Sequence, residues 1–156
     1  MEQIVRHTLY AIKKEITELP QSAHNHHPSC LVSIIIPTKD RINGLRELLD
    51  SIPQACIDVD YEIIICQDKK NDLVTALLNK YKNINHIVFD EEIFSANEKF
   101  SWSKLMNFAF SKASGDWIIF GSDDIIFYPQ AISNALKKVD SDNIGGVSFL
   151  HKNTVE

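Results

Sequence analysis

Two adjacent carboxylates follow a short apolar run, and they are the side chains in this sequence best suited to chemistry. Asp123 and Asp124 come shortly after residues 117–120 (Trp-Ile-Ile-Phe), a run too short for a helix and typical of a strand buried on both faces. Neighbouring carboxylates repel each other unless a cation or a hydrogen-bond donor compensates their charge. A hard divalent cation that bridges to phosphate oxygens would do so. The alternative is a solvated Asp-Asp turn ahead of Pro129, because Asp is a common turn former.

The elements around these carboxylates alternate between strands and helices. Short apolar runs predict strands over 31–36, 61–66, 86–89, 117–120 and 146–150. Apolar residues at helical spacing predict helices around 45–52 and over 72–81, 101–113 and 129–139. This alternation indicates an α/β fold, in which a mainly parallel sheet carries helices on both faces.

A helix and a linker are expected ahead of this alternating region. Apolar residues recur at helical spacing through 3–19 and Pro20 follows, whereas 21–29 is polar. We therefore predict an N-terminal helix and polar linker over 1–29, and one domain over 30–156. Helical spacing in the later helices also places Leu73, Ala76, Leu77 and Trp102 on inward faces.

Composition limits the class of protein. The chain has 156 residues, 44% of them apolar and 24% charged, which suits one packed domain. Its net charge of −5 argues against nucleic acid as a partner. No apolar run approaches the roughly 20 residues that span a bilayer, and the N-terminus lacks a secretory pattern. Cys30, Cys56 and Cys66 are odd in number and widely spaced, which predicts buried free thiols and a cytoplasmic location.

Polar segments follow three of the predicted strands. They are 37–41 (Pro-Thr-Lys-Asp-Arg), 67–70 (Gln-Asp-Lys-Lys) and 122–124 (Ser-Asp-Asp). The carboxyl ends of parallel strands share one edge of a sheet, where open α/β folds bind their ligands. Carboxylates can accept from a base or ribose, and cations can meet phosphate. This edge therefore suits a nucleotide bound with a metal, while neither a G-x-G-x-x-G nor a P-loop pattern is present.

Four motifs in a fixed order carry a resemblance to a known family. Residues 32–41 read V-S-I-I-I-P-T-K-D-R, against a family pattern V-S-I-I-I-P-T-Y-N-R, and 61–68 end in C-Q-D, against E-I-I-V-V-D-D. Residues 100–109 are similar to F-N-x-S-K-x-x-N-x-A, and 113–124 to A-x-G-[DE]-Y-[IL]-[LI]-F-L-[DN]-x-D. From about residue 32 to residue 150, the chain thus resembles the family 2 glycosyltransferases, which have the GT-A fold.

The resemblance implies a metal site at the two carboxylates. Asp124 matches the last Asp of the family's D-x-D motif, which holds a divalent cation, Mn²⁺ or Mg²⁺, on the diphosphate of the donor. Asp123 is the middle position of that motif and is expected to contribute to the metal site and to face the ribose or sugar.

The resemblance also implies contacts to the rest of the nucleotide sugar. Asp68 matches a carboxylate that contacts the base or ribose, and Thr38 and Asp40 match the loop that cradles the base. Lys104 and Asn107 lie three residues apart, which puts them on one helix face from which they could reach phosphate or sugar.

The chain departs from the family pattern in composition and in length. Ser122 stands where the first Asp of D-x-D is expected, Gln67 replaces the first Asp of the second-strand pair, and Arg41 is taken as a surface side chain. A full domain of the family continues into an acceptor-binding half with a catalytic base, and nothing after Leu150 supplies one. We therefore expect 30–156 to be a truncated nucleotide-sugar-binding domain. Its catalytic residue is unassigned, and its apolar edge favours self-association.

Three functions remain open from the sequence. The first is an inverting, metal-assisted glycosyltransferase, to which this chain contributes donor and metal binding and which acts on an acceptor hydroxyl. The second is a non-catalytic nucleotide-binding or protein-interaction domain. The third, a receiver-like signalling domain, needs an acidic pair after the first strand, where this chain has Pro37, Thr38 and Lys39.

Overall fold

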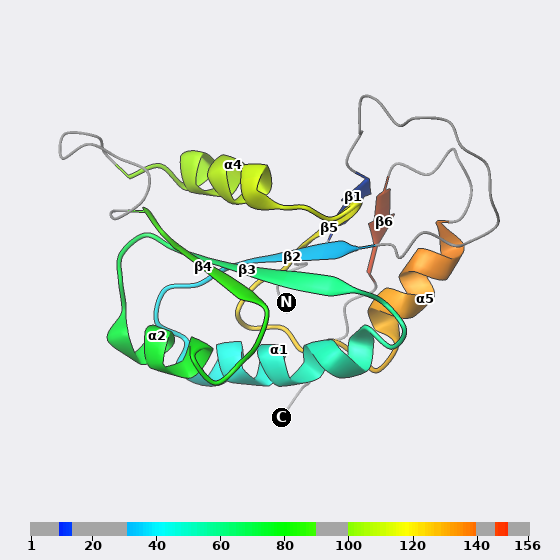
Figure 1. Cartoon of the computed structure of the whole chain (residues 1–156), viewed down its shortest axis with the longest axis horizontal. Helices are drawn as coiled ribbons and strands as arrows, with labels where there is room; N and C mark the ends of the chain where they lie inside the picture. Colours follow the sequence, from blue (N-terminus) through cyan, green and yellow to red (C-terminus); the bar gives the residue numbers. More distant parts are fainter. Residues whose placement is uncertain (1–9, 14–30, 90–99, 140–145, 150–156) are drawn as a thin grey trace, which may run out of the picture.

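A six-stranded sheet forms the centre of the molecule (Figure 1). The structure is a computed structural model that describes residues 10–13, 31–89, 100–139 and 146–149. Its strands are β1 (Tyr10–Lys13), β2 (Val32–Pro37), β3 (Tyr61–Gln67), β4 (Ile84–Val88), β5 (Trp117–Phe120) and β6 (Gly146–Ser148). Across the sheet the order is β4-β3-β2-β5-β1-β6, and the neighbours β4, β3, β2 and β5 are parallel. The predicted α/β fold with a mainly parallel sheet is confirmed.

Helices cover both faces of this sheet (Figure 1). They are α1 (Ile42–Ala55), α2 (Asp72–Leu78), α4 (Trp102–Lys112) and α5 (Ala131–Lys138). Ile34 and Ile36 of β2 pack with α1, whereas Ile35 between them packs with Leu105 of α4. The central strand therefore alternates between two apolar layers. Because both faces are buried, the strands read as continuous apolar runs in the sequence.

The N-terminal helix predicted over 3–19 is wrong where the structure describes it. Tyr10–Lys13 form β1, which pairs antiparallel with β5 through Ala11↔Ile119 and with β6 through Ala11↔Val147. A short apolar run fits strand and helix periodicity alike, and the edge of β5 offers backbone groups that a strand can pair with. The rest of 3–19 and the linker over 21–29 lie outside the described residues.

Two further details differ from the sequence prediction. β6 joins the sheet as predicted, but at its edge, where among the described residues it pairs with the antiparallel β1 and not with a strand of the parallel group. Leu73 and Trp102, predicted to face inward, are 68% and 49% exposed. Ala76, also predicted to face inward, is exposed as well. Leu77 is buried as predicted, together with Val74 and Leu78, because α2 is short and packs one position round from the predicted face.

The predicted buried thiols are confirmed for two of the three cysteines. Cys56 and Cys66 are free and buried, and burial raises the pKa of each thiol to about 12. Both are therefore protonated and unreactive at neutral pH. Cys30 lies outside the described residues. Among the helices that the structure describes, none has the length and apolar content needed to cross a membrane.

The amino edge of the sheet carries a partly buried carboxylate that several donors surround. Glu62 of β3 accepts hydrogen bonds from Ser33 Oγ (2.5 Å) and from the amide and hydroxyl of Ser114 (2.6 and 2.8 Å). Gly115 N–H in turn donates to Ser33 Oγ at 2.8 Å. Burial opposes ionisation of Glu62, but these donors outweigh it and lower the pKa of the carboxyl below its ordinary value of 4.5. The cluster ties the α4–β5 connection to β2 and β3.

At the opposite edge, α1 begins directly against the segment that follows β5. A Cβ on Gly44 would lie 2.5 Å from the carbonyl oxygen of Asp123, closer than real Cβ atoms approach backbone. Only glycine therefore fits there without movement of the helix or of the segment. Gly121, in that same segment, differs. A Cβ there would meet the Ile36 side chain at 3.4 Å, which is an ordinary contact.

We predict that Glu62→Gln lowers the free energy of unfolding at pH 7 by about 1–3 kcal/mol, because a neutral amide accepts these hydrogen bonds more weakly. Since the pKa of Glu62 is lower folded than unfolded, its stabilisation is present above the unfolded pKa and is lost as pH falls through the folded value. Urea unfolding at pH 7 and below pH 4 should show the difference at pH 7 and a smaller one in acid. Glu47→Gln, on an exposed position of α1, is the control. An equal loss at both pH values would contradict the role of the ionised carboxylate.

We also predict that Gly44→Ala destabilises the protein by about 1–3 kcal/mol, because the new Cβ forces the start of α1 and the Asp123 backbone apart. In an open helix the same change would stabilise by about 1 kcal/mol. Gly121→Ala is the matched control and should leave the melting temperature within a few degrees of the parent. Thermal unfolding of the two variants side by side measures the effect. Equal melting temperatures would show that α1 and the Asp123 segment do not need this close approach.

Candidate functional site

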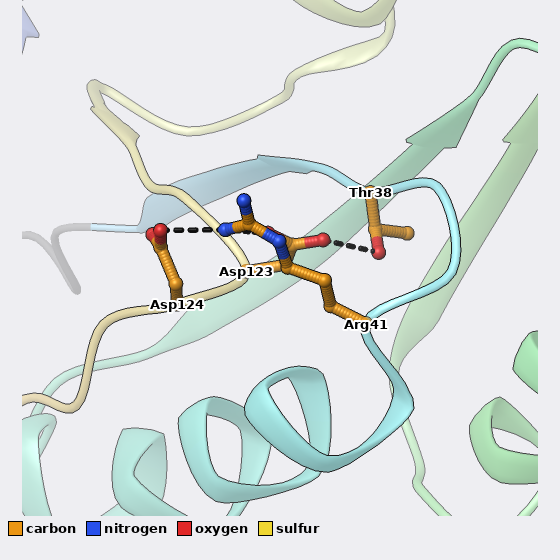
Figure 2. A network of polar contacts seen from close by, with 4 residues as sticks. All are labelled: Thr38, Arg41, Asp123 and Asp124. Atoms are coloured by element: carbon orange, nitrogen blue, oxygen red, sulfur yellow. Dashed lines mark hydrogen bonds and ion pairs between the residues drawn. The ribbon is translucent and has the colours of Figure 1, made fainter.

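The segments after β2 and β5 meet at the carboxyl edge of the parallel strands. β2 and β5 pair in the register Ile35↔Phe120, and Gly121 N–H donates to the Ile35 carbonyl oxygen at 2.9 Å just beyond it. This register carries Thr38 and Asp123 to corresponding positions. As predicted, the edge brings polar side chains from distant parts of the sequence together (Figure 2).

Asp123 is the buried member of the carboxylate pair. It is 7% exposed, and its Oδ2 accepts a hydrogen bond of 2.8 Å from Oγ1 of Thr38, which is 3% exposed. A buried carboxylate needs such a donor, because unpaired burial of a charge is costly. The contact fixes the segment after β5 to the end of β2 and leaves the other carboxylate oxygen, Oδ1, facing Arg41 (Figure 2).

Arg41 supplies the positive charge at this edge. Its Nη1 lies 2.6 Å from Oδ2 of Asp124 and 3.5 Å from Oδ1 of Asp123, so one guanidinium meets both carboxylates (Figure 2). The hydrogen bond to Asp124, and then the charges of Asp123 and Asp124, raise the pKa of the Arg41 guanidinium. Arg41 lies on the surface as predicted, with its side chain 58% exposed, but the sequence did not predict that it pairs with both carboxylates. Its place three residues after Thr38, at the same strand end, was the available signal.

The loop that carries Thr38 and Arg41 is fixed from β3. Gln67, which is fully buried, donates from its amide nitrogen to the Lys39 carbonyl oxygen at 3.1 Å, and its amide oxygen lies 2.7 Å from His86 Nε2. Asn71 donates to the same Lys39 carbonyl at 3.5 Å while it caps α2. Gln67 therefore has a structural role here.

The other predicted site residues lie outside this cluster of four side chains. Asp40 is exposed beside Arg41 and adds to the negative charge around its guanidinium. Asp68 follows β3 at the same edge, where its Oδ1 accepts from the Lys69 amide at 2.8 Å. Lys104 and Asn107 are exposed on α4, which packs on the opposite face of the sheet from α1.

The two carboxylates fit a cation that is shared with a ligand. In the part of the chain that the structure describes, no group of three His, Cys, Asp or Glu side chains could hold a metal alone. Mg²⁺ in nucleotide sites is usually bound by one or two carboxylates together with substrate phosphates and water. Asp123 and Asp124 provide two such carboxylates, and the Asp124 side chain is 38% exposed. The remaining ligands of a cation would come from phosphate and water.

Two relatives in sequence are named as glycosyltransferases. A probable glycosyltransferase of Sulfolobus acidocaldarius is 27% identical over 150 residues, which cover 94% of this chain and 31% of that protein. The uncharacterized glycosyltransferase YwdF of Bacillus subtilis is 30% identical over 120 residues, 70% of this chain and 38% of its own length. The chain thus spans about a third of the length of these curated relatives.

Solved structures share the fold. TarS 1–349 of S. aureus superposes with a TM-score of 0.57 at 21% identity, over 70% of this chain and 32% of that one. The mannosyltransferase PcManGT of Pyrobaculum calidifontis was solved with GDP-Man and Mn²⁺. It superposes with a TM-score of 0.56 at 16% identity, over 77% of this chain and 34% of that one. The family model for glycosyl transferase family 2 matches residues 33–153. The chain therefore belongs to glycosyl transferase family 2.

Proposed function

We propose that this chain forms the donor-binding part of an inverting, metal-assisted glycosyltransferase. It binds a nucleoside-diphosphate sugar at the carboxyl edge of β2, β3 and β5, and the complete enzyme transfers the sugar to an acceptor hydroxyl. The observation that carries the proposal is the convergence of Thr38, Arg41, Asp123 and Asp124 at that edge. Family membership and a shared fold with glycosyltransferases support it.

The two carboxylates differ in what they can offer a ligand. Asp124 is exposed, so it is the residue that we assign to the cation, with Asp123 behind it. Asp123 accepts the buried hydrogen bond from Thr38, and this contact fixes the position of the two carboxylates. A bound cation would supply positive charge to the departing diphosphate.

Further side chains are assigned to the nucleotide and the sugar. Asp68 and Asp40 follow β3 and β2 at the same edge and suit donors on the base or ribose. Lys104 and Asn107, exposed on α4, are proposed for phosphate or sugar. The buried thiols Cys56 and Cys66 support the cytoplasm as the proposed location.

A non-catalytic binding domain is the second candidate. It is favoured by apolar side chains that are exposed beside the two carboxylates. Ile126 and Tyr128, 60% and 59% exposed just after the carboxylates, offer an apolar surface to a partner, an acceptor or a second copy.

Nucleotide binding should depend on a divalent cation. We expect UDP, GDP or dTDP to bind more tightly with Mn²⁺ or Mg²⁺ than with chelator, by a coupling on the order of 1–3 kcal/mol, because the cation offsets repulsion between the diphosphate and the carboxylates. Calorimetric titration measures this. Asp124→Ala should reduce the metal effect more than Asp123→Ala, and Glu47→Ala should leave it unchanged. Equal affinities with and without metal for all three nucleotides would refute the metal role.

Sugar transfer separates the two candidates. We expect this chain alone to bind donor but to transfer little, because loss of a general base commonly costs about 10²–10⁴-fold in rate. Nucleotide release from a panel of nucleotide sugars, with Mn²⁺ and simple sugar acceptors, measures it. Rapid, acceptor-dependent release would show that the base lies within these residues. Binding of no nucleotide with metal present would favour the interaction domain.

A further inference from the structure

Arg41 lies where a cation bound by the two carboxylates would have to be. Its Nη1 is 2.6 Å from Oδ2 of Asp124 and 3.5 Å from Oδ1 of Asp123 (Figure 2). Mg²⁺ binds its oxygen ligands at about 2.0–2.1 Å, so it would share these oxygens with the guanidinium at close range. Two positive charges at that separation repel each other. The guanidinium and a divalent cation therefore compete for the same carboxylates.

The guanidinium can leave these carboxylates more easily than the Thr38 hydroxyl can. The Arg41 side chain is 58% exposed and that of Asp124 is 38% exposed, so water can replace their contact. Exposed ion pairs of this kind are weak and exchange readily. The Thr38–Asp123 hydrogen bond is buried, and it keeps the carboxylate segment in place when the guanidinium moves.

We propose that Arg41 is a resident counter-ion that exchanges partners when the donor binds. Without donor, its guanidinium neutralises Asp123 and Asp124. When a divalent cation arrives with the nucleoside diphosphate, the cation takes the carboxylates and Arg41 turns to the diphosphate. The inference rests on the proposed function and adds a residue to its donor site.

The diphosphate is a suitable second partner for this side chain. A guanidinium offers planar, paired donors that match phosphate oxygens. Once the cation has neutralised the two carboxylates, the diphosphate supplies the negative charge that the guanidinium can pair with. Arg41 stands immediately before α1, at its N-cap position, so its backbone is fixed while its side chain extends over the strand ends. One residue can therefore meet carboxylates and then phosphate without movement of the fold.

This exchange predicts opposite effects of one substitution on two ligands. Arg41→Gln should bind Mn²⁺ alone about two- to fivefold more tightly than the parent, because the competing charge is gone. With Mn²⁺ saturating, the same variant should bind UDP and GDP at least about fivefold more weakly, because a charged hydrogen bond to phosphate is lost. Arg46→Gln is the matched control, since Arg46 is an exposed α1 residue that contacts Asn43 at 3.4 Å. It should change neither affinity.

Mn²⁺ affinity is measured without nucleotide by following free Mn²⁺ with electron paramagnetic resonance as Mn²⁺ is titrated into the millimolar range. Nucleotide affinity is measured by calorimetric titration of UDP and GDP at saturating Mn²⁺. Circular dichroism checks that each variant is folded. Mn²⁺ affinity equal to or below that of the parent in Arg41→Gln, or no Mn²⁺ binding by either protein, would overturn the proposal. So would tighter Mn²⁺ binding with unchanged nucleotide affinity. Failure of parent and variants alike to bind any nucleotide would instead refute the proposed function.

Discussion

The parallel pairing of β2 with β5 is the constraint on which the candidate site depends. Its register places Val32 opposite Trp117, and the same offset of 85 residues separates Thr38 from Asp123, whose side chains form the buried hydrogen bond. A slip of one residue would turn every side chain of β5 to the other face and take Asp123 away from Thr38. Burial of both sheet faces makes such a slip costly, so the core that stabilises the fold also sets the geometry of the site.

The electrostatics of the edge follow from that geometry. Two carboxylates on consecutive residues are tolerated because each has a partner from the segment after β2: a hydroxyl for the buried Asp123 and a guanidinium for the exposed Asp124. Both partners come from a stretch of four residues, Thr38 to Arg41. That stretch is fixed by Gln67 and by the close approach of Gly44 to the Asp123 backbone. Charge compensation and backbone packing therefore support the same arrangement.

The sequence predicted the features that depend on local pattern. Apolar runs revealed the four parallel strands, and polar residues after them revealed that Asp68 and Asp124 share an edge. Strand order was beyond local pattern, because β5 lies beside β2 through contacts between residues some 85 positions apart in the sequence. The strand at Tyr10–Lys13 was missed because pairing with β5 overrode a helical periodicity. The ion pairs of Arg41 were missed because they depend on where a long side chain points.

Gln67 and Ser122 have a common consequence for the charge at this edge. Both stand where the family pattern has an acid, so each leaves this edge of the sheet with one negative charge fewer. The neutral amide of Gln67 donates to the Lys39 carbonyl, which an ionised carboxylate at this position could not do. Its oxygen must then accept from His86, so Nε2 of that ring carries a hydrogen. The Arg41 guanidinium then offsets one of the two negative charges of Asp123 and Asp124. The neutral substitutions and the position of Arg41 are thus parts of one electrostatic arrangement.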